Sequence, residues 1–566
     1  MRRELALKLG QARFGCAVRL AASADESRSR LLVGGVLSAF RGLEAPGVTT
    51  SLRRSSVRAV LAANAPFVWP LELTVSEVTA LLGWPLAAKE TELPGVPSRH
   101  PRLLPAVPAI RSQGRVLGAS ALASARPVAL AASDSLRHVH ILGPNGVGKS
   151  TLMANLALQD IEAGHGVVVI DPKGDLVTDL LARMPGERLD DLVVLDPTDA
   201  EPVGIDAFAG NPDLAADVLL GVFHSLYESA WGPRTSDILH ASLLSLARRA
   251  DLDDGSDAAR PTLTMLPLLL TNPGFRRSVV GRVVKADPLG LGSFWATFES
   301  WSDAERSQAI QPLMNKLRQV LLRPGLRAVF GQLHPRFAMH DVLTKQRVLL
   351  VNLSEGLLGP EASQLLGSLV VGLFWQAALG RTLVPERQRR PVFVHIDEMQ
   401  RYVRVGDVGD ALARARGLGV GFTLAHQHLG QLTPSLREAV MANARSKVAF
   451  QLSPSDAKIY AATSSGQLEA ADFQALPAFQ AYAQLLSGNQ AAPWCSLATT
   501  PLPPTTRLRG EALARDRSRV RYGQPLATIE ADLAALVAGA PGARASASDA
   551  EPLGRRRPAA RQGGAR

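Results

Sequence analysis

The residues with the clearest chemical role form the segment Gly143-Pro-Asn-Gly-Val-Gly-Lys-Ser-Thr151, which fits the pattern G-x-x-x-x-G-K-[ST]. Backbone N–H groups of such a loop converge on a chain of phosphates, and the N-terminus of the following helix adds positive potential. In this pattern Lys149 reaches the β- and γ-phosphates, and Ser150 ligates Mg²⁺. The segment therefore predicts a site for a nucleoside triphosphate and Mg²⁺, built from Gly143, Pro144, Asn145, Gly146, Val147, Gly148, Lys149, Ser150 and Thr151.

Two carboxylates follow a later apolar run, Pro391-Val-Phe-Val-His-Ile-Asp397-Glu398. Asp397 is placed to hold the Mg²⁺ shell through water, and Glu398 to polarise the attacking water. A third polar group, Gln427, ends the run that starts at Val420, where its amide can sense the γ-phosphate or orient water. His426 and His428 flank Gln427, but no third ligand with recognisable spacing accompanies them, so we do not predict a metal site there.

The elements that must position these residues alternate between strands and helices, which favours a doubly wound, mostly parallel sheet. Ligands of such sheets bind beyond the carboxyl ends of the strands, where the loop and the acidic pair are expected. The pattern predicts strands at 137–142, 166–171, 191–196, 347–353, 391–397, 420–428 and 445–452, an edge strand within 474–486, and helices at 149–162, 175–183, 360–379, 407–416 and 434–444.

Composition shifts divide the 566 residues into five parts. Helical periodicity replaces strand signals from about 209 to 344, which predicts an all-α insertion in the sheet. We expect a small basic α/β unit with a Pro-rich linker at 1–125, the two halves of the sheet domain at 126–208 and 345–500, and a mostly disordered basic tail at 501–566, with one helix near 525–537. Arg234 lies in a loop of the insertion and is either a nucleic-acid or subunit contact or an ordinary solvated arginine.

The charge of the chain points to a polyanionic partner. Its net charge is +11, and residues 1–141 hold 18 Lys/Arg against 9 Asp/Glu. Such an excess suggests nucleic acid or an acidic membrane surface, although a merely arginine-rich soluble protein has the same signature. Cys16 and Cys495 are too few for a disulfide framework, and the apolar run 365–380 is too short for a membrane span. No signal peptide is recognisable, so we expect a soluble, cytoplasmic protein.

Four segments together resemble the TraG/TraD-type coupling ATPases of conjugation and type IV secretion, within the HerA/FtsK group of DNA-pumping motors. They are Gly166-Val-Val-Val-Ile-Asp-Pro-Lys-Gly-Asp-Leu, His395-Ile-Asp-Glu-Met-Gln, Ala413-Arg-Ala-Arg-Gly-Leu-Gly and Leu424-Ala-His-Gln. The similarity covers about 127–486. The sequence departs from the membrane-bound members because it shows no transmembrane helices, so any attachment to the inner membrane is expected to be peripheral, through a partner.

The resemblance implies a RecA-like sheet flanked by helices, with ATP and Mg²⁺ as cofactors. It assigns catalytic roles to Lys149, Glu398 and Gln427, and metal binding to Ser150 and Asp397. It also matches Arg416 to an arginine that reaches the nucleotide of the neighbouring subunit, although a cation at a helix C-terminus is the competing explanation. Arg445 is a second candidate. The implied partners are DNA bound without sequence preference, further copies in a ring that is a hexamer in the family, and a relaxase or secretion-channel proteins.

Three functions fit these observations. The first is an ATP-driven DNA translocase of a conjugative or type IV secretion-like system. The second is a nucleotide-dependent adaptor that docks protein cargo for secretion on its helical insertion. The third is a motor like HerA that processes DNA ends and needs a nuclease partner.

Overall fold

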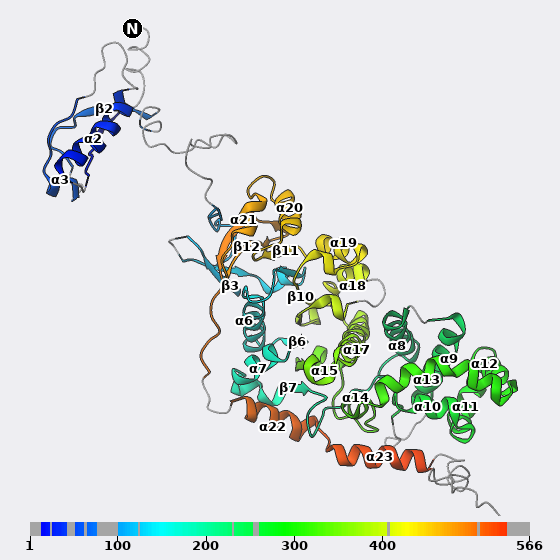
Figure 1. Cartoon of the computed structure of the whole chain (residues 1–566). Coiled ribbons are helices and arrows are strands. Elements are labelled where there is room, and N and C mark those ends of the chain that lie inside the picture. Colours follow the sequence, from blue (N-terminus) through cyan, green and yellow to red (C-terminus); the bar gives the residue numbers. More distant parts are fainter. Residues whose placement is uncertain are drawn as a thin grey trace, which may run out of the picture. The chain divides into compact units, whose positions relative to one another are not determined.

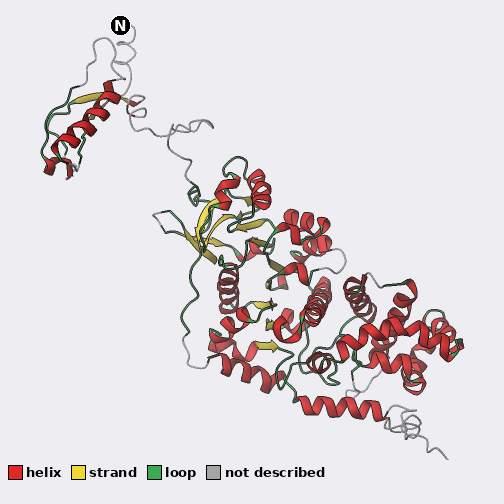
Figure 2. Cartoon of the chain, in the orientation of Figure 1, coloured by secondary structure: helices red, strands yellow, loops and turns green. Residues whose placement is uncertain are grey.

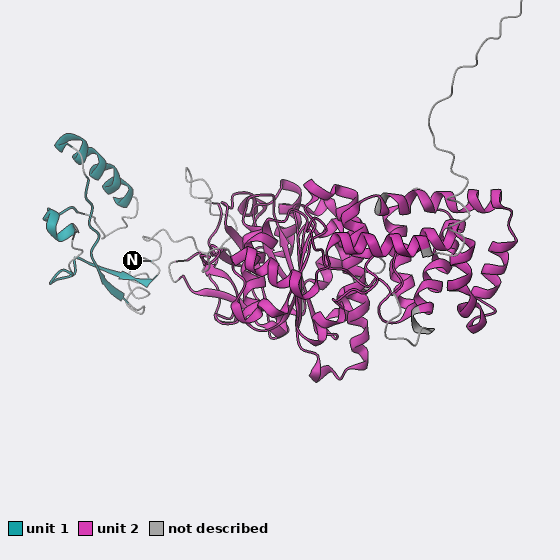
Figure 3. Ribbon diagram, turned by 90° about the horizontal axis from the view of Figure 1, so that it is seen from below, with its two compact units in different colours: residues 1–98 teal, residues 99–566 magenta. Residues whose placement is uncertain are grey.

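The computed structural model describes residues 13–22, 25–41, 51–61, 65–75, 78, 100–122, 125–228, 231–252, 260–403, 408–505 and 510–539. The chain forms two compact units, Met1–Ser98 and Arg99–Arg566 (Figure 3). The sequence places the first boundary near residue 125, whereas residues 115–130 already belong to the sheet of the second unit. Among the remaining residues, the segments 79–99 and 540–566 lie outside the described ones.

The first unit contains a two-stranded antiparallel ribbon and two helices. Strand β1 (Arg13–Cys16) pairs with β2 (Leu71–Thr74). Helix α2 (Glu26–Arg41) is followed by the short helix α3 (Val57–Leu61). No residue of α2 is buried, and Leu31 is 76% exposed. The described part of this unit therefore has little core of its own.

The second unit is built on an eleven-stranded sheet (Figures 1 and 2). Its order is β4-β3-β15-β12-β11-β5-β10-β9-β6-β8-β7. The strands from β11 to β7 pair in parallel, and the other four add antiparallel pairs. The bounds are β3 (Arg115–Ser120), β4 (Pro127–Leu130), β5 (Val139–Leu142), β6 (Gly166–Asp171), β7 (Leu192–Leu195), β8 (Val348–Asn352), β9 (Val392–Ile396), β10 (Val420–His426), β11 (Ser446–Ala449), β12 (Gln480–Gln484) and β15 (Cys495–Ala498).

This architecture confirms the predicted fold class, a mostly parallel α/β sheet flanked by helices. One feature differs: the expected edge strand is β12, but β15, β3 and β4 extend the sheet beyond it. A small separate hairpin, β13 (Leu486–Ser487) with β14 (Gln490–Ala491), follows β12.

Strand β6 shows how the sheet is buried on both faces. Val167 and Val169 pack into one core, while Val168 and Ile170 pack into the other. A run of β-branched residues without polar alternation is the pattern expected of such a strand. The first core also receives helices α6 (Lys149–Glu162), α7 (Asp175–Ala182) and α22 (Gly510–Tyr522). The second receives α15 (His340–Thr344), α17 (Pro360–Leu379), α18 (Val408–Ala415), α19 (Pro434–Asn443) and the helical insertion.

The insertion is entirely helical in its described residues, as Figure 2 shows. It comprises α8 (Pro212–Leu226), α9 (Pro233–Leu252), α10 (Met265–Thr271), α11 (Pro273–Ala286), α12 (Leu291–Ser300), α13 (Asp303–Leu321) and α14 (Pro324–Phe330). Helix α8 packs on α17, so the insertion is joined to the sheet through that helix. Among the described residues, one helix, Pro360–Leu383, is long and apolar enough to cross a membrane, and 72% of its apolar window is buried inside the unit.

The described residues 510–539 of the C-terminal segment form two helices, of which the sequence predicts one. Helix α22 precedes α23 (Leu526–Gly539), the helix expected near 525–537. Ala514 and Ser518 of α22 are buried, and the Ser518 hydroxyl accepts from the N–H of Val194 on β7 at 2.8 Å. Helix α22 is therefore part of the sheet domain.

A buried ion-pair network joins the antiparallel side of the sheet to its centre. Asp160 on α6 accepts from the Nε and Nη2 atoms of Arg115 on β3 at 2.7 and 2.8 Å. It also lies 3.0 Å from Nε2 of His395 on β9, and all three side chains are buried. Because burial of a charge costs several kcal/mol unless it is paired, each of these groups depends on the others.

Asp160→Ala should therefore lower the free energy of unfolding by about 3–5 kcal/mol, because it leaves the Arg115 charge buried and unpaired. Urea unfolding followed by circular dichroism measures this. The matched control is Asp179→Ala, which removes a half-exposed partner of Arg183 on α7 and should cost less than about 1 kcal/mol. Equal effects of the two substitutions would contradict the role given to the buried network.

Candidate nucleotide-binding site

The glycine-rich loop runs from the end of β5 to the start of α6. Gly146 and Gly148 have φ values of +81° and +109°, which L side chains rarely adopt. A Cβ at Gly148 would lie 2.9 Å from the ring of Phe479. Phe479 also donates its backbone N–H to the Val147 carbonyl at 2.8 Å. Gly143 donates its N–H to the carbonyl of His426 at 3.3 Å. The loop is thus held from two sides, by the residue before β12 and by the end of β10.

Lys149 folds over its own loop. Its ammonium donates to the Pro144 carbonyl at 2.8 Å, and the residue is 5% exposed. Burial lowers the pKa of Lys149, while the charges of Asp397 and Glu398 oppose that change. A buried cation at the N-terminus of a helix, behind a glycine-rich loop, is suited to a phosphate chain.

The acidic pair lies at this same edge of the sheet. Asp397 follows β9, and its Oδ2 atom lies 3.4 Å from Oγ of Ser150. Burial, and next the charge of Glu398, raise the pKa of Asp397 to about 6. A hydroxyl and a carboxylate side by side are hard oxygen ligands of the kind that Mg²⁺ takes. The donor set therefore fits a magnesium ion held between Ser150 and Asp397.

Glu398 is held by two side-chain amides. Nε2 of Gln427 donates to Oε1 at 2.7 Å, and Nε2 of Gln400 donates to Oε2 at 2.9 Å. Burial would raise the pKa of Glu398, but these hydrogen bonds and the charges of Lys149 and Lys173 outweigh it and lower the pKa. Glu398 also has a φ of +49°, the left-handed conformation, which is uncommon for a residue other than glycine. The arrangement favours the ionised form of Glu398, and the amides of Gln400 and Gln427 fix the orientation of its carboxylate.

Sequence reasoning missed two groups at this site. Gln400 stands two residues after Glu398, inside the segment that carries the family resemblance. Lys173 stands in the loop after β6, and its ammonium donates to Oδ1 of Asn145 at 3.3 Å. The signal for Lys173 was its position: a lysine directly after a buried parallel strand lies at the carboxyl edge, where ligands bind.

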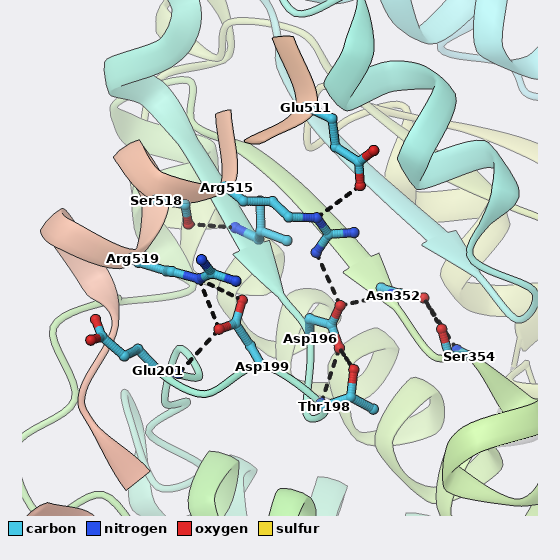
Figure 4. A network of polar contacts seen from close by, with 11 residues as sticks. Asp196, Thr198, Asp199, Glu201, Asn352, Ser354, Glu511, Arg515, Ser518 and Arg519 are labelled. Carbon is cyan, nitrogen blue, oxygen red and sulfur yellow. Dashed lines mark hydrogen bonds and ion pairs between the residues drawn. The ribbon is translucent and has the colours of Figure 1, made fainter. Parts of the chain in front are cut away.

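A second polar network supports the same edge from the side of β7 and β8 (Figure 4). Asp196, which follows β7, accepts from Nδ2 of Asn352 at 2.8 Å and from Arg515 of α22 at 3.1 Å. Arg519 of the same helix pairs with Asp199 at 2.8 Å. The C-terminal helix is thereby tied to the ends of β7 and β8, of which β8 pairs with β6.

The expected trans arginine lies at the opposite edge. Arg416 precedes β10 and Arg445 precedes β11, so both stand at the amino ends of the parallel strands, and both are exposed. Arg137 precedes β5 beside them: burial, and then the like charges of Arg416 and Arg445, lower its pKa. The structure therefore brings Lys149, Ser150, Asp397, Glu398 and Gln427 together and leaves Arg416 and Arg445 away from them.

The two histidines beside Gln427 have different surroundings. His426 stacks on His140 of β5 at 4.9 Å between ring centroids, with the two Nε2 atoms 2.7 Å apart, and His428 is exposed. Tyr460 lies with its hydroxyl 2.9 Å from Nδ1 of His140. Among the described residues no group of three or more His, Cys, Asp or Glu side chains is arranged to hold a metal ion. Arg234 packs on the ring of Trp301 at 4.4 Å.

Two family models match the chain. The model of the central domain of helicase HerA matches residues 114–219. The model of the DNA-binding domain of type IV secretion-system coupling proteins matches residues 294–482. No curated protein sequence matches the chain.

Solved structures of one bacterial conjugative coupling protein, TrwB, share the fold. The unbound monoclinic form of TrwBdeltaN70 is 19% identical over 71% of this chain and 92% of its own, with a TM-score of 0.51. The complex with the ATP analogue ADPNP is 19% identical over 74% and 98%, with a TM-score of 0.50. The complex with ADP and Mg²⁺ is 18% identical over 71% and 92%, also with a TM-score of 0.50.

The glycine-rich loop offers a graded test of the site. Gly146→Ala and Gly148→Ala both place an L side chain at positive φ, at about 1–2 kcal/mol. At Gly146 the added Cβ meets open space, whereas at Gly148 it meets Phe479. Gly148→Ala should therefore weaken binding of Mg-ATP by about 10-fold more than Gly146→Ala does, as measured by calorimetry. Phe479→Ala in the Gly148→Ala chain should recover part of that loss; no recovery would contradict the contact.

Proposed function

Because models of the HerA central domain and of the DNA-binding domain of type IV coupling proteins both match the chain, we propose that it is a TraG/TrwB-like coupling ATPase, an ATP-driven DNA translocase of a conjugative or type IV secretion-like system. The observation that carries the proposal is the meeting of two distant segments. The phosphate-binding loop and the acidic pair lie within 3.4 Å at Ser150 and Asp397. Glu398 stands beside them, held by Gln427.

In the proposed reaction, the loop from Gly143 to Thr151 binds the phosphates of ATP, and Lys149 neutralises charge at the β- and γ-phosphates. Ser150 and Asp397 would hold Mg²⁺, and the ion would neutralise charge that develops on the phosphate oxygens. Glu398 accepts a proton from the attacking water. That role requires an ionised carboxylate, which the hydrogen bonds from Gln400 and Gln427 favour.

Gln427 gives a route from the nucleotide to the sheet. Its side chain contacts Glu398, and its neighbour His426 bonds to both the phosphate-binding loop and β5. Loss of the γ-phosphate would therefore change the contacts of Gln427 and His426 at the end of β10. Helix α18 lies before this strand and α19 after it, so a shift of β10 would move surfaces far from the nucleotide.

We infer that the substrate moved is DNA, bound through its phosphates and without sequence preference. The match to the DNA-binding domain of coupling proteins supports this, and so does the excess of 18 Lys/Arg over 9 Asp/Glu in residues 1–141. Contacts of this kind release counterions, so the affinity should fall steeply with salt. TrwB has been solved with ADP and Mg²⁺, which supports the same cofactors here.

A neighbouring subunit would complete the site. Arg416, Arg445 and Arg137 gather at the amino edge of the strands, and the exposed Arg416 and Arg445 form no ion pair within the described residues. In a ring, expected to be a hexamer, this edge would face the next subunit's nucleotide.

The match to the HerA central domain at 114–219 keeps a DNA-end-processing motor as a second candidate, which differs by requiring a nuclease partner.

The main test is ATP hydrolysis by the full chain, with and without single- and double-stranded DNA. We expect DNA to stimulate hydrolysis, Lys149→Ala to abolish nucleotide binding, and Glu398→Gln to bind ATP but hydrolyse it about 10²–10⁴-fold more slowly. Lys285→Ala, an exposed lysine on α11, is the matched control and should behave as wild type. Intact basal hydrolysis that no DNA stimulates would contradict the translocase.

Subunit mixing tests the arginine edge. Arg416→Ala should lower hydrolysis by about 10³-fold or more, because a neighbour's arginine offsets charge in the transition state. Mixed with Glu398→Gln subunits, which keep Arg416, the variant should regain activity at sites bordered by an intact arginine. Arg277→Ala on α11 is the control for a lost surface charge. If Arg416→Ala is inactive and mixing restores nothing, Arg416 does not act across subunits.

A further inference from the structure

A second lysine is directed at the phosphate-binding loop. Lys173 follows β6 in the turn Asp171-Pro-Lys-Gly-Asp175, and its side chain is exposed. Its ammonium donates to Oδ1 of Asn145, inside the loop, at 3.3 Å. Within the described residues the Lys173 ammonium forms this hydrogen bond and no ion pair with a carboxylate.

The turn that carries Lys173 is fixed by buried groups. The carboxylate of Asp171 accepts from the N–H of Lys173 at 2.9 Å and from that of Val177 at 3.1 Å. Gly174 has a φ of +92°, and a Cβ there would lie 2.8 Å from Oδ1 of Asn352. The backbone of the turn therefore has one well-defined place.

Asn352 is itself held in place by the polar network of Figure 4. Its amide donates to Asp196, which Arg515 of the C-terminal helix also contacts. Three strand ends and α22 thus define where the stem of Lys173 starts, while the long side chain keeps its own rotational freedom. A lysine on a rigid base can change partners without any movement of the backbone.

The charge of Lys173 reaches the catalytic groups. It lowers the pKa of Lys149, in addition to the larger effect of burial, and it helps to lower the pKa of Glu398. Two ammonium groups at one loop repel each other, and a polyanion between them would turn that repulsion into attraction. Glu398 is the residue to which the proposed function assigns the water that attacks the terminal phosphate.

We propose that Lys173 is a second phosphate-binding lysine, which exchanges its contact with Asn145 for the γ-phosphate of bound ATP and thereby makes the site prefer a triphosphate to a diphosphate. The inference rests on the proposed function, since it names a further residue for the same nucleotide. It gives the chain a second cation at the γ-phosphate, in addition to Lys149 and to any arginine that a neighbour supplies. After hydrolysis the lysine returns to Asn145, and the diphosphate is held without it.

The test measures affinity, not turnover. Calorimetry with Mg²⁺ gives the dissociation constants of a non-hydrolysable ATP analogue and of ADP for the full chain and its variants. Lys173→Met keeps the apolar stem and removes the charge; it should weaken the analogue about 10- to 100-fold and ADP less than about 3-fold. Lys173→Arg should retain most of the preference for the analogue. Lys285→Met is the matched control and should change neither constant.

Two results would overturn the inference. Equal weakening of both nucleotides, reproduced by Asn145→Ala, would mean that Lys173 only steadies the loop. Unchanged affinities in Lys173→Met would mean that it touches no phosphate. Both results presuppose a wild-type chain that binds ATP and ADP. A wild-type chain that binds neither nucleotide fails at the proposed function itself, which separates that failure from failure of the lysine.

Discussion

The contact between the Ser150 hydroxyl and the Asp397 carboxylate spans 247 positions of sequence, and the rest of the molecule is arranged around it. It forms because β5 and β9 both pair in parallel with β10 and therefore end at one edge of the sheet. Parallel strands need crossovers, and these crossovers supply the helices that bury both faces. The chemistry at the edge thus depends on a core that is apolar on both sides, of which the valines of β6 are the clearest case.

Buried polar groups link this edge to distant parts of the unit. Asp160 connects the antiparallel strand β3 to α6 and β9. Asp196 connects α22 to β7 and β8. The stacked imidazoles of His140 and His426 connect the strand before the glycine-rich loop to the strand before Gln427. Since an unpaired buried polar group is costly, these links favour movement of the connected elements as groups.

The sequence was most informative where burial is two-sided and the helices are long. Helices α6 and α17 and strand β6 begin and end where their patterns predict. Strands β3 and β15 were missed, because Arg-Val-Leu-Gly-Ala-Ser and Cys-Ser-Leu-Ala are short, rich in small residues, and stabilised by partners far away in sequence. Helix α22 was missed because its many arginines resemble a solvated tail; two of them are instead paired with Asp196 and Asp199.

For the candidate site, as for the fold, the sequence predicted the residues in strong local patterns and missed others. The residues brought together at the loop all stand in segments with strong local patterns. Lys173 and Gln400 were missed because their significance comes from what they contact, Asn145 and Glu398, and not from their own spacing. Arg416 and Arg445 were predicted from the sequence but stand apart from the site within one chain. Their proposed ligand is the nucleotide of another subunit.

The most direct test of the central claim is an experimental structure of the full chain with Mg²⁺ and a non-hydrolysable ATP analogue. We expect the ion between Ser150 and Asp397, the β- and γ-phosphates at Lys149, and a water at Glu398 in line with the terminal phosphate. A nucleotide bound elsewhere, or one at the loop with Asp397 outside the shell of the ion, would contradict it.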